Sequence, residues 1–253
     1  GGGFVATWSS LGQDGSDYGI YAQQFGASGN PVGGEFLVNA SFTAGTQIFS
    51  DVEGLADGGY VISWQSWMED GNKAGLMAQR YDASGNPVGD EFLVNDETYG
   101  DQARPSISAR DDGRFVITWT SFDGQDGSGQ GIFAKVYPGT STGPQPVTLT
   151  EGDEFGVNST TYSDQIYSNV TNLTDGGFVI NWSSLNQDGS GWGVYGQRYD
   201  SAGNEIGGEF RVNSHWVADQ IEPSATALDN GGFLITWHSM GQDSSGWGVY
   251  GQS

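Results

Sequence analysis

The segment GGFVINWSS at Gly176–Ser184 decides the fold, because close copies of it recur along the chain. The other copies are GGFVATWSS at Gly2–Ser10, GGYVISWQS at Gly58–Ser66, GRFVITWTS at Gly113–Ser121 and GGFLITWHS at Gly231–Ser239. Their tryptophans are Trp8, Trp64, Trp119, Trp182 and Trp237, so successive copies stand 56, 55, 63 and 55 residues apart. A nearly constant period of this length indicates a tandem array of one supersecondary unit.

Each repeat contains about four short segments with the composition of β-strands. In the copy that spans 57–111 they are Tyr60–Trp64, Leu76–Tyr81, Glu91–Asn95 and Pro105–Ala109, separated by residues typical of turns. No segment has helical periodicity. We therefore predict an all-β fold, a β-propeller-like array of four-stranded antiparallel blades. A β-sandwich or a β-solenoid explains the period less well.

The repeats divide the chain into units of approximately 1–56, 57–111, 112–174, 175–229 and a partial unit 230–253. We expect these units to form one repeat domain of about 4.5 repeats, cut from a longer chain. Two further strands would complete five blades, and an open or longer array is the alternative. The third unit is irregular, since Pro138–Pro146 and then Val147–Thr150 replace its DASGNPVG turn; we expect a specificity feature or a drifted surface loop there.

The chain of 253 residues is strongly acidic, with 31 acidic and 8 basic residues and a formal net charge of −23. This charge argues against a nucleic acid or an anionic membrane as partner. No apolar run approaches the roughly 18 residues that span a bilayer, so we expect no membrane insertion. The absence of cysteine excludes a disulfide framework and a thiolate metal site.

The loop after each Trp strand is rich in Gly, Asp, Gln and Ser. One aspartate recurs in it, at Asp14, Asp70, Asp126, Asp188 and Asp243. Calcium prefers several carboxylate, amide and carbonyl oxygens, so these residues are candidate ligands of Ca²⁺. The spacing does not match an EF-hand, and the alternative is a plain hairpin loop in which Asp forms an Asx turn.

Aromatic residues outside the periodic Trp strands are candidate ligand-binding residues. They lie in or beside loops and are Tyr18, Trp67, Trp192, Trp216 and Trp247. An exposed ring with amides and carboxylates nearby can stack on the apolar face of a sugar, so the expected partner is a glycan or another extracellular surface ligand. The alternative is that these rings cover the ends of the blades.

Two further sets of polar residues recur with the period. Gln47, Gln102, Gln165 and Gln220 precede the fourth strand, and Gln23, Gln79, Gln197 and Gln252 lie on the second strand, where the third unit has Lys135. We expect buried hydrogen bonds between blades, with a sugar- or peptide-reading groove as the alternative.

Catalytic motifs are weak in this sequence. The two histidines, His215 and His238, do not form an HExxH motif, and neither a GxSxG elbow nor a P-loop is present. Pairs of carboxylates are too common in so acidic a chain to indicate a glycosidase. We therefore expect no enzyme, although propellers also host hydrolases and lyases.

The consensus GGFVxTWxS…QDGSGxGVYxQRYDxxGNxxGxEFxVN resembles repeats of very large secreted bacterial proteins, often calcium-dependent, type I-secreted, RTX-like adhesins. The RTX nonapeptide GGxGxDxUx is missing. The resemblance implies an extracellular or cell-surface location. We predict a non-enzymatic adhesion module that binds glycan through its loop aromatics. A structural spacer or filament that self-associates through repeat edges is the alternative, and a polysaccharide-processing enzyme is less favoured.

Overall fold

The computed structural model describes residues 2–139 and 152–253, and all of its regular elements in these ranges are β-strands. The first two sheets contain β1 (Phe4–Leu11), β2 (Tyr18–Phe25) and β3 (Pro31–Leu37), then β4 (Gln47–Gly54), β5 (Tyr60–Trp67), β6 (Ala74–Tyr81) and β7 (Pro87–Leu93). The third contains β8 (Gln102–Ala109), β9 (Phe115–Ser121), β10 (Gly131–Tyr137) and β11 (Phe155–Gly156). The last two contain β12 (Gln165–Asn172), β13 (Phe178–Leu185), β14 (Trp192–Tyr199) and β15 (Glu205–Arg211), then β16 (Gln220–Ala227), β17 (Phe233–Met240) and β18 (Trp247–Gln252).

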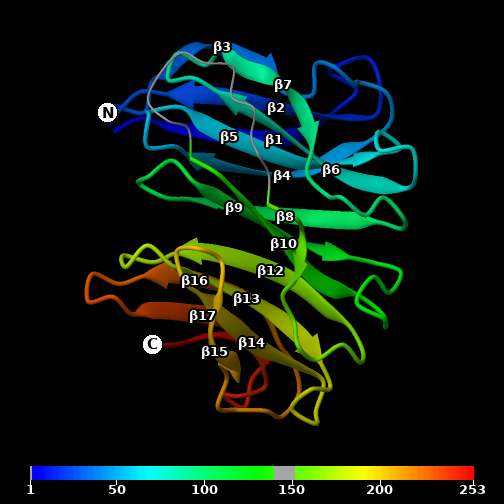
Figure 1. Cartoon of the computed structure of the whole chain (residues 1–253), viewed down its shortest axis with the longest axis vertical. Coiled ribbons are helices and arrows are strands. Elements are labelled where there is room, and N and C mark those ends of the chain that lie inside the picture. Colours follow the sequence, from blue (N-terminus) through cyan, green and yellow to red (C-terminus); the bar gives the residue numbers. More distant parts are fainter. Residues whose placement is uncertain (1, 140–151) are drawn as a thin grey trace. The chain divides into compact units, whose positions relative to one another are not determined.

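Within each sheet, strands that follow one another in the chain are hydrogen-bonded neighbours (Figure 1). The all-β prediction and the predicted four-stranded antiparallel blades are thus confirmed.

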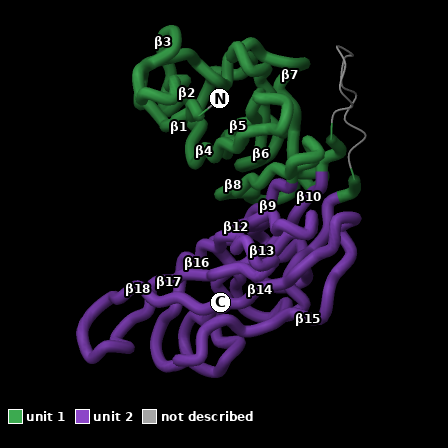
Figure 2. Tube along the Cα trace, turned by 90° about the vertical axis from the view of Figure 1, so that its left-hand side faces the viewer, with its two compact units in different colours: residues 1–115, 137–153 green, residues 116–136, 154–253 purple. Residues whose placement is uncertain are grey.

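The chain forms two compact units, residues 1–115 with 137–153 and residues 116–136 with 154–253 (Figure 2). The prediction of one repeat domain stays a prediction. The irregular segment Pro138–Thr150 lies almost wholly outside the described residues. Among the described residues, no helix is long and apolar enough to cross a membrane.

The sheets are offset by one strand from the repeats read in the sequence. The fourth strand of each predicted unit pairs with the Trp strand of the following unit, as β4 does with β5 and β12 with β13. We call β4, β8, β12 and β16 the inner strands, since each is the first strand of its sheet. The offset arises because the connection into the inner strand is long, whereas the next turn, at Leu55–Gly59, is a tight hairpin.

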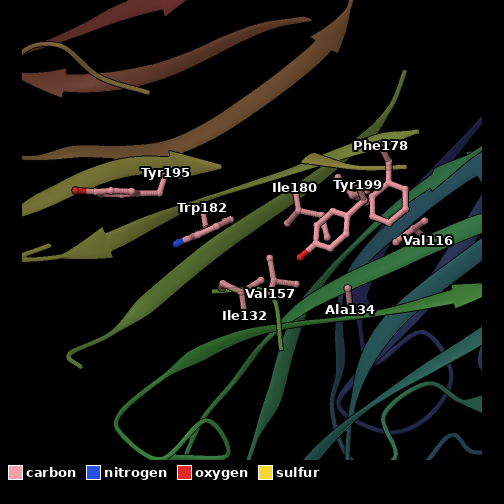
Figure 3. Packing of buried hydrophobic residues seen from close by; sticks show 10 residues of the cluster. Val116, Ile132, Ala134, Val157, Phe178, Ile180, Trp182, Tyr195 and Tyr199 are labelled. Carbon is pink, nitrogen blue, oxygen red and sulfur yellow. The ribbon is translucent and has the colours of Figure 1, made fainter. Parts of the chain in front are cut away.

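The periodic tryptophans form the core, as the sequence predicts. Trp64, Trp119 and Trp182 are fully buried and Trp237 is nearly so. Trp8 is only partly buried, because β1 is an edge strand of its sheet. Figure 3 shows the cluster around Trp182 in the second unit, where aliphatic residues of several strands pack with stacked rings.

Aromatic contacts join consecutive sheets within each unit. In the first unit Tyr60 and Tyr81 stack at 5.0 Å between ring centroids, and Phe36 of the preceding sheet tilts against Tyr81 at 5.4 Å. In the second unit the same arrangement recurs: Phe178 stacks on Tyr199 at 4.8 Å and Phe155 lies 5.6 Å from Tyr199. Each such ring buries a large apolar area, which explains how a chain poor in aliphatic residues builds a core.

A buried amide pair ties the end of each sheet to the start of the next inner strand. Asn213 accepts a hydrogen bond from Val194 N at 2.7 Å and donates to Gln220 Oε1 at 3.0 Å. The equivalent pairs are Asn39 with Gln47, Asn95 with Gln102 and Asn158 with Gln165. The predicted buried hydrogen bonds of Gln47, Gln102, Gln165 and Gln220 are therefore confirmed, and all four are 0 % exposed.

We expect Asn213→Ala to lower the free energy of unfolding by about 2–4 kcal/mol, because it removes the hydrogen-bond partner of Val194 N–H and of Gln220 Oε1. Urea denaturation followed by tryptophan fluorescence measures this. The matched control is Asn204→Ala, which removes an exposed turn residue of the same type. Equal losses in the two variants would contradict a special role for the buried pair.

Candidate functional site

Two kinds of loop meet at one edge of the sheets in each unit. They are the loops after the Trp strands and the connections into the inner strands. In the first unit Thr46 Oγ1 donates to Asp17 Oδ2 at 2.6 Å, and in the second Trp192 N donates to Asp219 Oδ1 at 3.1 Å. We call this edge of each unit its rim. It consists of residues 12–17, 39–46, 68–73 and 96–101 in the first unit and 122–130, 159–164, 186–191, 214–219 and 241–246 in the second, with the adjoining strand ends.

The predicted ligand-binding aromatics all lie on the rim. Tyr18, Trp67, Trp216 and Trp247 are 38 %, 40 %, 50 % and 53 % exposed, and Trp192 is partly buried. Two further rings, Tyr99 and Tyr162, are 69 % and 55 % exposed in the connections into inner strands and were not among the predicted residues. Rings exposed to this degree leave their faces accessible, whereas rings that merely cap the sheets would be covered. Ligand binding by these residues stays a prediction.

The five loop aspartates form Asx turns. The Oδ1 atoms of Asp14, Asp70, Asp126, Asp188 and Asp243 accept hydrogen bonds of 3.0–3.2 Å from the backbone N–H two residues later. In four repeats the Oδ2 atom of this aspartate lies close to a glycine. It is 2.6 Å from the position that a Cβ atom would take at Gly19, Gly75, Gly131 and Gly193. Among the described residues, no group of three or more His, Cys, Asp or Glu is arranged to hold a metal ion. The arrangement favours the turn, and the metal role of these aspartates stays a prediction.

One side-chain contact on the rim is made by different residue types in different repeats. Gln13 donates to Glu35 Oε1 at 2.6 Å, and Gln125 with Glu154 and Gln187 with Glu209 repeat this hydrogen bond. In the second sheet the glutamine is replaced by Glu69, which faces Glu91. Burial, with the charges of Glu91 and Asp70, raises the pKa of Glu69 from 4.5 to about 6, against a hydrogen bond from Ser66.

The inner strands β4, β12 and β16 carry a β-bulge, and each of the four inner strands has one residue in the left-handed region at the same place, which we call the bulge position. These residues stand two positions after the buried glutamine and are Phe49 (φ 55°), Arg104 (58°), Tyr167 (58°) and Glu222 (53°). A non-glycine residue with positive φ is strained, and such residues concentrate at functional sites. The backbone is therefore the same in four repeats, while the side chain is aromatic, cationic, phenolic or acidic.

At the bulge of β16, in the second unit, a carboxylate lies beside an imidazole. Glu222 Oε2 lies 3.2 Å from His238 Nδ1, and both side chains are 48 % exposed. Ser183 Oγ accepts from Glu222 N at 3.1 Å, which fixes the strained backbone. The positions equivalent to His238 are Ser9, Gln65, Thr120 and Ser183, so only the last repeat places an imidazole beside a carboxylate here.

In the first unit the inner strand β4 carries two carboxyl groups. Asp51 Oδ2 accepts from Ile107 N at 2.8 Å, and Glu53 Oε1 from Ala109 N at 3.5 Å. Burial raises the pKa of Asp51 and of Glu53. Asn169 accepts from Ala225 N at the position equivalent to Asp51, so Asp51 performs a structural task that an amide performs elsewhere. Glu53 has no acidic counterpart, because the equivalent residues are serine and threonine.

No family model and no curated protein matches the sequence. Several solved structures share the fold. A protein of unknown function from Dyadobacter fermentans has a TM-score of 0.64 at 13 % identity, covering 98 % of this chain and 74 % of its own. An α-L-arabinofuranosidase from Fusarium graminearum has a TM-score of 0.62 at 10 % identity, covering 98 % of this chain and 77 % of its own. An endo-arabinase from Bacteroides thetaiotaomicron has a TM-score of 0.51 at 15 % identity, covering 98 % of this chain and 88 % of its own. The likeness supports the predicted propeller-type fold.

The comparisons correct the predicted identity. The neighbours with a named activity are arabinofuranosidases and an arabinase, whereas the sequence repeats were assigned to calcium-associated, RTX-like adhesins. That assignment, the non-enzymatic adhesion function and the exclusion of an enzyme are therefore wrong. The error arose because a repeat consensus reports how the blades are built and carries no information on what they bind.

We expect Asp14→Asn to leave the melting temperature nearly unchanged, since an amide oxygen accepts the Ser16 N–H equally well, and Asp14→Ala to lower it. Thermal unfolding with calcium and with a chelator measures both. A drop in the Asn variant together with a chelator-induced drop in the unaltered chain would instead favour a bound cation.

We expect Glu69→Gln to stabilise the chain by about 1–2 kcal/mol at pH 8 and by less at pH 5. A carboxyl group whose folded pKa is raised binds a proton more tightly when folded. Its stabilising contribution is therefore present below pH 4.5 and is lost as the pH rises through about 6. Denaturation curves between pH 4 and 8 measure this. Glu205→Gln, on an exposed strand, is the control. Parallel pH profiles of the original chain and Glu69→Gln would contradict the prediction.

Proposed function

We propose that this chain is a carbohydrate-active enzyme, in which rim residues bind a polysaccharide and the exposed inner-strand carboxylate Glu222 serves the cleavage of glycosidic bonds. One observation carries the proposal. The four inner strands repeat a strained backbone position, whereas its side chains, Phe49, Arg104, Tyr167 and Glu222, differ in chemistry. A purely structural bulge needs no such diversity, whereas a ligand-binding surface within either unit does.

The fold supports this proposal. The neighbours with a named activity act on arabinose-containing carbohydrates, and each is matched over nearly the whole of this chain. Because the identities are only 10–15 %, the likeness supports a reaction class and leaves the sugar open.

Glycoside hydrolysis needs a carboxylic acid that gives a proton to the leaving oxygen and a carboxylate that acts as base or nucleophile. Glu222 is the exposed inner-strand carboxylate, and His238 orients it. We assign Glu222 as the candidate base or nucleophile, from its surroundings within the second unit.

The exposed rings of the rim fit a polymer better than a single sugar. Equivalent positions carry Tyr18, Trp192 and Trp247, and a ring can stack on the apolar face of a pyranose or furanose. A polymeric substrate is met outside the cell, so the extracellular location is retained as part of the proposal. Self-association through free strand edges stays a separate prediction.

We expect release of reducing ends from at least one polymer in a panel of arabinan, xylan and polygalacturonate. Glu222→Gln should lower the rate at least 100-fold while leaving binding intact, because it removes charge and keeps shape. Trp192→Ala/Trp247→Ala should weaken binding about tenfold or more. Phe4→Ala, an exposed ring on β1, is the control for the aromatic variant. The absence of release from every polymer would refute the proposed activity.

A further inference from the structure

The first unit contains a cavity at the end of its strands that lies opposite to its rim. The volume of this cavity is about 720 Å³, which is in the range of pockets that hold small molecules. Its lining comes mainly from the start of β1, the end of β2, the end of β4 and the start of β5, and all of it belongs to the first unit. Because the eight residues of β1 run from this end to the rim, roughly 23 Å separate the two. The cavity is therefore distinct from the site proposed above.

The lining of the cavity is uncharged, although the chain carries 31 acidic and 8 basic residues. Most of the lining side chains are apolar, among them Phe25, Val32, Val52 and Leu55. Phe4 stacks on Phe25 with 4.8 Å between the ring centroids, so the two rings form an aromatic wall. A charged ligand would lose its hydration here without gaining an ionic partner, so the site favours an uncharged one.

Two neutral polar side chains, Tyr60 and Gln24, complete the lining. Tyr60 is 3 % exposed, and its Oη atom is buried without a hydrogen-bond partner of normal geometry. Burial raises the pKa of this hydroxyl group to about 12, against an interaction with Gln24, so the group stays protonated and able to donate. A buried hydroxyl group without a partner costs free energy, so a ligand that forms a hydrogen bond with it is favoured.

An aromatic wall with a single hydrogen-bonding point distinguishes between classes of neutral ligand. A sugar carries a hydroxyl group on nearly every carbon atom, and two polar side chains leave most of these groups without partners. A planar aromatic compound with one hydroxyl group stacks on Phe25 and directs its only polar group to Tyr60 or Gln24. The cavity volume accommodates more than one ring.

We propose that this cavity binds a neutral phenol with two fused or linked rings, whose ring system stacks on Phe25 and whose hydroxyl group forms hydrogen bonds with Tyr60 and Gln24. The inference is independent of the proposed function, because the cavity shares no residue with either rim or with Glu222. It gives the chain a second class of ligand.

The test compares 2-naphthol, naphthalene and 2-naphthoate by isothermal titration calorimetry at pH 7. The three compounds share a ring system and differ in carrying a neutral hydroxyl group, no polar group or a negative charge. We expect 2-naphthol to bind about tenfold more tightly than either of the others. Tyr60→Phe should lower the affinity for 2-naphthol to that for naphthalene and leave naphthalene unchanged, because it removes the hydroxyl group and keeps the ring.

A second variant fills the cavity. A Cβ atom at Gly54, in the lining, would meet no atom within 4 Å, and the equivalent positions carry Ala109, Asn172 and Ala227, so a side chain is accepted here. Gly54→Leu should weaken the binding of 2-naphthol and of naphthalene about tenfold, because it occupies the space of the rings. Gly54→Ala is the matched control, since a methyl group leaves most of that space open.

Tyr199→Phe is the control for Tyr60→Phe, because Tyr199 is a buried tyrosine of the second unit whose Oη atom also has no hydrogen-bond partner. Circular dichroism verifies the folding of each variant, and Gly54→Leu keeps the test informative if Tyr60→Phe unfolds. Equal affinity for 2-naphthol and 2-naphthoate, or unchanged 2-naphthol binding in Gly54→Leu, would overturn the site. A neutral oligosaccharide that binds in place of 2-naphthol and is lost in Gly54→Leu would overturn it too. So would a dimer, seen by sedimentation, that Gly54→Leu dissociates while 2-naphthol does not bind, since a second copy would then fill the cavity.

Discussion

The structure depends on a buried amide pair that recurs at the junctions between sheets. An asparagine at the end of one sheet accepts a backbone N–H of that sheet and donates to the glutamine that opens the next inner strand, as Asn39 does to Gln47. The glutamine in turn donates to the carbonyl of Ala44 in the connecting loop. A buried polar group without partners costs more than the bond itself contributes, so this pairing fixes the start of each inner strand as strictly as hydrophobic packing fixes its middle.

A fixed start explains why the bulge recurs two residues later with the same left-handed backbone. Strain of this kind persists only where the surrounding structure over-determines it, and here the buried glutamine on one side and the β-ladder on the other do so. The residue at the bulge is then free to change chemistry without changing geometry. Arg104 and Glu222 occupy one backbone position in two repeats and present opposite charges.

The Trp segments made much of the fold predictable, because β-branched and aromatic residues after a Gly-Gly turn identify a strand and its copies identify the array. The pairing of each fourth strand with the following repeat was not predictable, since periodicity is the same whichever neighbour a strand joins. The loop aromatics were found because a ring in a Gly-rich loop stands out. The bulge residues were missed because φ > 0 at Phe49 or Tyr167 leaves no mark on composition. An alignment of the internal repeats against one another would find them, because they occupy the position that varies most beside an invariant glutamine.

The same comparison separates structural carboxylates from chemical ones. Asp51 ties two inner strands through a bond that Asn169 makes with an amide, so its charge is incidental to its task. Glu222 has no such counterpart: its repeat-equivalents are Phe49, Arg104 and Tyr167, and its partner His238 replaces small or neutral polar residues. Selection for blade structure alone preserves what is common to the repeats. Charges confined to one repeat, with exposed side chains, therefore have to be explained by what the chain binds or transforms.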